Sequence, residues 1–219
     1  MFDSSAQSPP YDGPVLAAVD LEVMRGDRRL FSGLDFSVNT GTLLHVEGHN
    51  GSGKTTLLRV LCGLLQPQEG EVRWRGTDIR SLREEYCKAV LYFGHLNGIK
   101  NDLTGIENLR VSATLDGDEV DEEALWDALK RMGLAGFEDL PTKVLSQGQK
   151  KRVALARLML STATLWVLDE PFTALDVKAV AFLESLIAGH VERGGVAVIT
   201  THQEVALTSG TVERLKLGS

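Results

Sequence analysis

Residues 48–55 read GHNGSGKT. They fit the pattern G-x-x-x-x-G-K-[ST], which is typical of a phosphate-binding loop, or P-loop. The glycines let the backbone curl until its N–H groups point inward, Lys54 supplies a positive charge for the β- and γ-phosphates, and Thr55 offers a hydroxyl to Mg²⁺. The pattern therefore predicts binding of a nucleoside triphosphate with Mg²⁺, at a loop made of Gly48, His49, Asn50, Gly51, Ser52, Gly53, Lys54, Thr55 and Thr56.

The segments on both sides of the loop have the character that a P-loop needs. TLLHVE, at residues 42–47, predicts a strand before the loop. KTTLLRVLCGLL, at residues 54–65, predicts a helix after it, with apolar side chains at helical spacing that end near Gln66-Pro67: Leu57, Leu58, Leu61 and Leu64. Residues 15–24 and 28–38 predict two further short strands.

The second half of the chain alternates predicted helices and strands. LWVLDE at 165–170 and VAVITTH at 196–202 are continuous apolar runs of the kind expected for parallel strands buried on both faces. After Ser146, QKKRVALARLML at 149–160 predicts a helix, and residues 177–195 predict another. Residues 116–144 predict an acidic helical insertion with one apolar face: Leu125, Ala128, Leu129 and Met132. This order predicts an α/β fold with a largely parallel sheet.

Composition excludes several classes of protein. The net charge of −7 argues against a protein that acts mainly on nucleic acid. No apolar run reaches the length of about 18 residues that a membrane span requires, and the first residues lack the features of a targeting peptide. Cys62 and Cys87 belong to no CxxC pattern, so we expect two reduced, buried thiols.

Paired acids follow the apolar run at 165–168. Asp169, at the carboxyl end of a predicted strand, can hold the Mg²⁺ shell, with a water between carboxylate and ion. Glu170, one residue later, can orient or deprotonate an attacking water. Beside a P-loop, these acids indicate nucleotide hydrolysis rather than an ordinary capped turn.

Three further segments resemble motifs of the ATP-binding-cassette (ABC) ATPases. LSQGQKKRVALARLML at 145–160 is similar to their signature motif, EPFTALD at 170–176 to the segment that ends in their D-loop, and TTH at 200–202 to their switch histidine. The order and spacing also match, and the similarity extends over nearly the whole chain from about Val15. Independently of the resemblance, Ser146 and Gln149 have the spacing of a helix capping box.

The resemblance implies an ABC nucleotide-binding domain: a P-loop NTPase core (RecA-like, mostly parallel sheet) with an antiparallel β edge and an inserted α-helical subdomain. After a tail at 1–14, residues 15–219 would form this domain, with the core at about 15–94 and 162–219 and the helical subdomain at about 95–161. It also implies ATP and Mg²⁺ as ligands and a head-to-tail homodimer. In that dimer the signature residues act on the ATP held by the partner: Ser146, Gln147, Gly148 and Gln149.

Carried over residue by residue, the resemblance assigns the catalytic roles. Lys54 would bind the phosphates, Glu170 would be the general base, and His202 would stabilise the γ-phosphate and the attacking water. Asp176 would contact the partner subunit. His45 and His190 have no such placement, and we expect structural roles for both.

Two positions depart from the common family pattern. Where many cassettes have an aromatic residue that stacks on adenine, this chain offers Arg25, whose planar guanidinium can also stack on a ring. His95 falls at the place of the Q-loop glutamine, where it would contact the Mg²⁺ shell or couple the nucleotide to a membrane partner; an ordinary loop side chain is the alternative. A histidine can coordinate a metal only through a neutral ring nitrogen.

The wording GHLNGIK at 94–100, followed by LTGIENL at 103–109, resembles the ATP-binding subunits of haem exporters of bacterial cytochrome c biogenesis. This resemblance implies integral membrane partners in a cytochrome c maturation complex, a peripheral place on the cytoplasmic face of the inner membrane, and no direct haem binding. The ATPase subunit of another ABC exporter, for lipid, drug or peptide, is the alternative.

Overall fold

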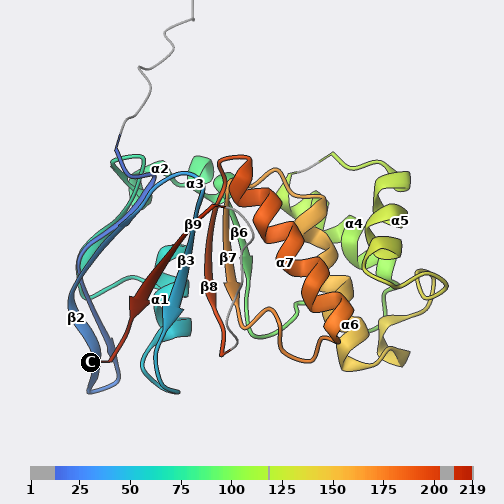
Figure 1. The fold of residues 1–219 in the computed structure, drawn as a ribbon, viewed down its shortest axis with the longest axis horizontal. Coiled ribbons are helices and arrows are strands. Elements are labelled where there is room, and N and C mark those ends of the chain that lie inside the picture. The colour runs from blue at the N-terminus through green and yellow to red at the C-terminus, as the bar shows by residue number, and fades with distance from the viewer. Residues whose placement is uncertain (1–12, 118, 203–209, 219) are drawn as a thin grey trace, which may run out of the picture.

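The protein is described here by a computed structural model, which covers residues 13–117, 119–202 and 210–218. Within that part of the chain, two β-sheets and a group of helices form successive layers across the molecule (Figure 1). Residues 1–12 of the predicted tail lie outside the described residues.

Five parallel strands form the central sheet, in the order β6-β7-β8-β3-β9. Their bounds are β3 Thr42–Glu47, β6 Val90–Phe93, β7 Leu165–Asp169, β8 Val196–Thr200 and β9 Thr211–Lys216. Every residue of β7 and β8 is buried, as the apolar runs predict. Because the strands are parallel, their carboxyl ends meet at one edge, which is the lower edge of the sheet in Figure 1.

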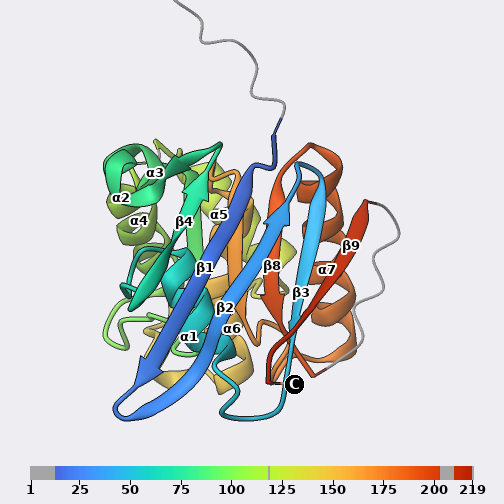
Figure 2. The same cartoon turned by 90° about the vertical axis from the view of Figure 1, so that its left-hand side faces the viewer.

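The antiparallel strands form a separate sheet, in the order β2-β1-β4-β5. Their bounds are β1 Leu16–Arg25, β2 Arg28–Val38, β4 Glu69–Trp74 and β5 Thr77–Asp78. This sheet lies in front of α1 (Lys54–Leu61) in Figure 2, so that the helix is enclosed between the two sheets. Buried side chains of β1, α1 and the central sheet share one hydrophobic core.

Alternation along β7 divides its side chains between two cores. Leu165 and Val167 belong to the core on the α1 side, whereas Trp166 and Leu168 belong to the core on the side of α7 (Val177–Glu192). Successive strand residues point to opposite faces, so a strand in the middle of three layers is apolar at every position. This explains the continuous apolar run that precedes Asp169.

The remaining helices lie mainly on the α7 side. They are α4 Gly105–Asp116, α5 Glu122–Arg131 and α6 Gln147–Leu155, with short helices α2 Ile79–Leu82 and α3 Glu84–Ala89 elsewhere and 3₁₀ turns at Thr142–Val144 and Ala156–Met159. The predicted apolar face at 125–132 is buried in the same core as Trp166 and Leu183. The division into an ATPase core and a helical subdomain stays a prediction, because this core is shared. Within the described residues, no helix combines the length and apolar character of a membrane span.

The predicted helix after the P-loop is too long. α1 ends at Leu61, and Leu64, which was expected on its buried face, is 63% exposed. Gly63 has φ +69° and donates its N–H to Val60 O, while Leu64 N–H reaches back to Arg59 O. This is the hydrogen-bond pattern of a Schellman motif, which ends the helix one turn before Gln66-Pro67.

The prediction that both thiols are buried is wrong for Cys87. Cys62 is partly buried and burial raises the pKa of its thiol, but Cys87 is exposed on α3. The two histidines that were expected to be structural are both buried. His45 has Nε2 3.2 Å from Thr201 O, and His190 stacks on Trp166 with ring centroids 3.9 Å apart.

Two leucines of α4 provide a matched test of the helical packing. Leu109 is buried in the shared core, whereas Leu115 on the same helix is 79% exposed. We expect Leu109→Ala to lower the free energy of unfolding by about 2–5 kcal/mol, through lost burial and the remaining cavity. Leu115→Ala should change it by less than about 0.5 kcal/mol. Urea unfolding measures both, and equal effects would contradict the described packing.

Candidate functional site

The P-loop joins β3 to α1 along a path that needs glycine at two points. Gly48 has φ +156°, and a Cβ there would overlap Ser52 Oγ and come within 2.9 Å of Leu217 O. Gly53, with φ +101°, is the N-cap of α1, and a Cβ would lie 3.2 Å from the Phe31 ring of β2. The antiparallel sheet therefore presses against the loop, and the glycines make that close approach possible.

Lys54 crosses the inside of this loop. Its ammonium group donates a hydrogen bond to Gly48 O at 2.7 Å and lies 3.4 Å from His49 O. The charge is therefore held at the mouth of the loop by main-chain oxygens. An arriving phosphate offers charged acceptors in place of these neutral ones.

Asp169 stands at the junction of three elements. Its Oδ2 accepts a hydrogen bond from Thr55 Oγ1 at 2.7 Å, and its Oδ1 accepts one from Thr200 Oγ1 at 2.6 Å. The carboxylate is only 3% exposed, so without such donors its burial would be costly. Asp169 and Thr200 are register partners at the ends of β7 and β8, which is why the two side chains meet.

Glu170 directly follows β7 in an unusual backbone conformation. Its φ is +49°, in the left-handed region that costs a non-glycine residue about 1–3 kcal/mol. Its N–H donates to Thr200 O at 3.1 Å and to Thr200 Oγ1 at 3.0 Å. The side chain places Oε1 3.5 Å from His202 Nε2. The turn thus brings a carboxylate and an imidazole together at the carboxyl edge of the sheet.

A single cavity of about 390 Å³ collects most of the predicted residues. Arg25, His95 and His202 reach it from segments far apart in the sequence, and Asp169 and Glu170 lie on its wall. The lining residues are Arg25, Leu30, Asn50, Gly51, Gly53, Lys54, Thr55, Thr56, His95, Asp169, Glu170, Thr173 and His202. Gly48, His49 and Ser52 belong to the loop but not to this lining, and Ser52 is buried.

The residues of the predicted signature lie outside this cavity. Ser146 caps α6, accepting from Gln149 N–H at 3.2 Å, while Gln149 Oε1 accepts from Ser146 N–H at 2.9 Å. The capping box predicted from the sequence is therefore confirmed. Ser146 and Gln147 are exposed, and Gly148 packs against the loop after Glu170, where a Cβ would lie 2.8 Å from Ala174 O.

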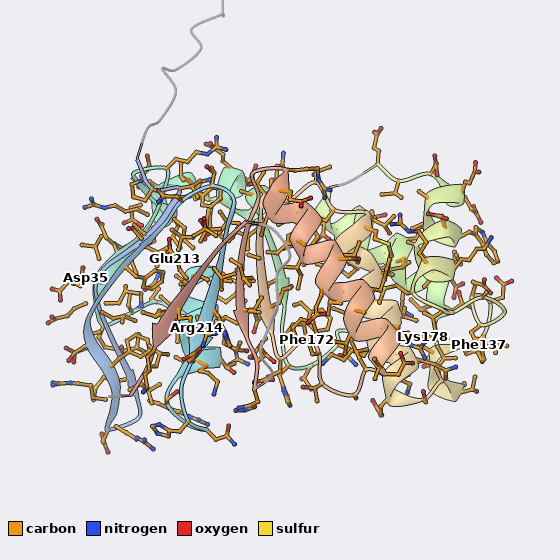
Figure 3. The ribbon with its side chains drawn as sticks, in the orientation of Figure 1. Asp35, Phe137, Phe172, Lys178, Glu213 and Arg214 are labelled. Carbon is orange, nitrogen blue, oxygen red and sulfur yellow. The ribbon has the colours of Figure 1, made fainter. Side chains whose placement is uncertain are left out.

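Asp176 is the N-cap of α7. Its Oδ1 accepts a hydrogen bond from Ala179 N–H at 2.8 Å at the start of α7, and its Oδ2 lies 3.8 Å from the Arg152 guanidinium. In Figure 3, Phe172 lies near the lower ends of the parallel strands, whereas Lys178, at the start of α7, lies farther toward the helical region and close to Phe137 in this view. Asp176 is thus held beside α6 and away from the P-loop lining.

Sequence reasoning missed four residues of this region. Leu30 lines the cavity without a motif of its own, and Thr173 lines it from within EPFTALD, where no role was assigned to it. Thr200 was seen only as part of TTH, although its place at the end of a buried strand was a usable signal. Lys151 donates to Glu170 O at 2.6 Å and is buried, which no local pattern around LSQGQKKR indicates.

Comparison with known proteins gives consistent matches. Residues 31–173 match the family model described as ABC transporter. A cytochrome c biogenesis ATP-binding export protein, CcmA, of Nitrosospira multiformis is 55% identical over 204 residues, which cover 93% of this chain and 99% of that protein. The protein of that name in Haemophilus influenzae is 48% identical over 204 residues, with coverages of 93% and 95%.

Solved structures agree with the fold. The ATP-binding subunit of an ABC transporter superposes with a TM-score of 0.76 at 25% identity, covering 86% of this chain and 79% of the other. A dimeric ATP-binding cassette in a post-hydrolysis state, bound to ADP and Pi, gives a TM-score of 0.78 at 21% identity, with coverages of 93% and 97%. The second likeness concerns the fold alone. The predicted fold class is confirmed, with the antiparallel strands in a sheet of their own.

Thr200 allows a test of the junction around Asp169. Thr200→Val keeps the shape of the side chain but leaves Asp169 Oδ1 without its hydroxyl donor in a buried place. We expect the free energy of unfolding to fall by about 1–3 kcal/mol. Thr211→Val, at an exposed strand position, is the matched control and should have little effect. Urea unfolding at neutral pH measures both variants, and an unchanged Thr200→Val would show that the hydroxyl is dispensable.

Proposed function

Since the chain belongs to the ABC transporter family, and within it to the cytochrome c biogenesis ATP-binding export proteins, we propose that its ATPase cycle drives haem export by the membrane subunits of a cytochrome c maturation complex. The chain itself is an ABC transporter ATPase. The observation that carries the chemical assignment is the cavity in which Lys54, Asp169 and Glu170 meet. Haem does not contact this polypeptide in our proposal.

The P-loop binds the triphosphate of ATP. Main-chain N–H groups at the start of α1 favour negative charge, and Lys54 moves its ammonium from the loop carbonyls to the β- and γ-phosphates. Arg25 lies on the cavity wall beside Leu30, where its guanidinium stacks on the adenine in place of an aromatic side chain. The adenine ring thus packs against residues of the antiparallel sheet.

The residues near Asp169 fit a magnesium ion. Thr55 Oγ1 and Asp169 Oδ2 are 2.7 Å apart at the cavity wall, and both are the hard oxygen donors that Mg²⁺ prefers. Among the described residues, no group of three or more His, Cys, Asp and Glu side chains is arranged to hold a metal by itself. A site of two protein oxygens suits Mg²⁺, which keeps several waters and shares phosphate oxygens. Thr55 would be a direct ligand and Asp169 would act through water. When bound, the ion neutralises charge on the phosphates.

Glu170 is the general base of this proposal. Its carboxylate lies on the cavity wall and is held by its strained backbone in one direction. It accepts a proton from the water that attacks the γ-phosphate. His202, with Nε2 3.5 Å from Glu170 Oε1, orients the carboxylate and donates toward the γ-phosphate.

The position of the signature favours a dimer. Ser146–Gln149 begins a capped helix, and such a helix start attracts anions, yet it lies outside the cavity of its own chain. A second copy placed head-to-tail would bring this surface to the nucleotide, with Asp176 near the contact. His95, exposed at the cavity rim, would couple the nucleotide to the membrane partner at the cytoplasmic face of the inner membrane.

Replacing the base tests the chemistry. In the assembled complex we expect Glu170→Gln to bind ATP with unchanged affinity but to lose at least about 100-fold in turnover, because the water loses its proton acceptor. The ATP-bound variant should also accumulate as a closed dimer. Phosphate release and size-exclusion chromatography measure these effects. Glu192→Gln, at an exposed end of α7, is the control and should turn over normally. Parental turnover by Glu170→Gln would refute the assignment.

Purification of the native complex tests the cargo. We expect integral membrane proteins of cytochrome c maturation to copurify with the chain, and the isolated chain to give no saturable change in the haem absorption spectrum at one equivalent. Mass spectrometry and difference spectroscopy are the measurements. Copurification with the membrane subunits of a lipid, drug or peptide exporter would support the alternative. A stoichiometric spectral change would contradict an indirect role.

A further inference from the structure

One face of α6 lies directly on the segment that follows β7. Gly148 and Lys151 are three residues apart and so share a helix face. A Cβ on Gly148 would lie 2.8 Å from Ala174 O, and the Lys151 ammonium donates to Glu170 O at 2.6 Å. Next to them, the Arg152 guanidinium lies 3.8 Å from Asp176 Oδ2. The segment 170–176 therefore has polar contacts with α6 at its beginning and end and approaches it closely at Ala174.

The attachment at Glu170 holds a backbone that would otherwise relax. Glu170 has φ +49° and precedes Pro171, and a residue before proline favours extended backbone. Its N–H is held by Thr200 and its carbonyl by Lys151. A left-handed residue persists only when its surroundings determine it on more than one side. Both peptide groups of Glu170 are thus fixed, and with them the direction of its carboxylate.

Lys151 is an unusual residue for a purely structural contact. It is only 8% exposed, and its ammonium lies 5.7 Å from the centroid of the Phe93 ring. Burial lowers its pKa, while the nearby carboxylates of Glu170 and Asp169 act in the opposite direction. A buried ammonium is costly unless its charge and donors are used. The ammonium uses a donor on Glu170 O, a main-chain oxygen of the residue that faces ATP in our proposal.

We propose that Lys151 is a positioning residue for hydrolysis, which fixes the main chain of Glu170 and so joins the signature helix to the general base of the same chain. When the Ser146 end of α6 contacts the nucleotide of a partner, the Lys151 side chain then transmits the effect to the main chain of Glu170. This inference rests on the proposed role of Glu170. It assigns Lys151 no contact with ATP, because Lys151 does not line the cavity.

The test uses the assembled complex with Lys151→Met and Lys151→Gln. Methionine keeps the length and apolar stem but cannot donate, whereas glutamine keeps an N–H donor. We expect Lys151→Met to lower kcat about tenfold or more, since small displacements of a reacting group cost rate steeply. Lys151→Gln should recover part of the loss. The Kd for ATP, measured in the Glu170→Gln background to prevent hydrolysis, should stay within about threefold, since the P-loop contacts are intact.

Lys150→Met is the matched control. Lys150 is the neighbouring lysine of α6, and its ammonium donates to Asn101 Oδ1 at 3.0 Å rather than to Glu170. Its kcat should match the parent protein. An unchanged kcat in Lys151→Met, an equal loss in Lys150→Met, or a parallel weakening of ATP binding would each overturn the proposal. Glu170→Gln distinguishes failure of the proposed function from failure of this inference. If Glu170→Gln retains turnover, the assignment of Glu170 as general base is wrong. If only Lys151→Met retains turnover, the positioning role of Lys151 is wrong.

Discussion

The carboxylate of Asp169 is the point on which the site depends. β3 and β7, which carry the P-loop and the acidic pair, are not neighbours in the sheet, because β8 lies between them. Thr200 at the end of β8 and Thr55 at the start of α1 each donate a hydroxyl to one oxygen of Asp169. Two charge-assisted hydrogen bonds to a buried carboxylate join three elements, and removing either donor leaves one oxygen of that carboxylate without its hydroxyl donor.

Burial of the central sheet on both faces explains why the chemistry gathers at its edge. The faces are occupied by two hydrophobic cores, and the two fully buried strands β7 and β8 carry Asp169 and Thr200 at their ends. Parallel strands place all their carboxyl ends on one side, which is where the P-loop, the acidic pair and His202 occur. Ligands of open α/β sheets bind at such an edge for this reason.

The sequence predicted the parts of this structure that local chemistry determines. The P-loop, the capping box at Ser146 and the strand before Asp169 each depend on residues a few positions apart. β6 and the polar edge strand β9 were missed, because short or half-exposed strands carry little periodic signal. The early end of α1 was missed because Gly63 was not recognised as its stop. Thr200 and Lys151 act only through partners 19 to 31 residues away, which no spacing rule reveals.

The position of α6 relative to the cavity separates two functions that we propose for a single chain, binding ATP and hydrolysing it. Its cavity is lined by the P-loop and by Glu170, the proposed base, while the capped start of α6, the predicted signature, lies outside that lining. Lys151 and Arg152 of α6 contact the segment 170–176, so in our proposal a displacement of the exposed helix end would act on the backbone of Glu170. In our proposal, the P-loop binds ATP, whereas α6 and the segment 170–176 determine whether Glu170 is placed for hydrolysis. An ATPase built in this way can hold its nucleotide until a second surface engages the helix.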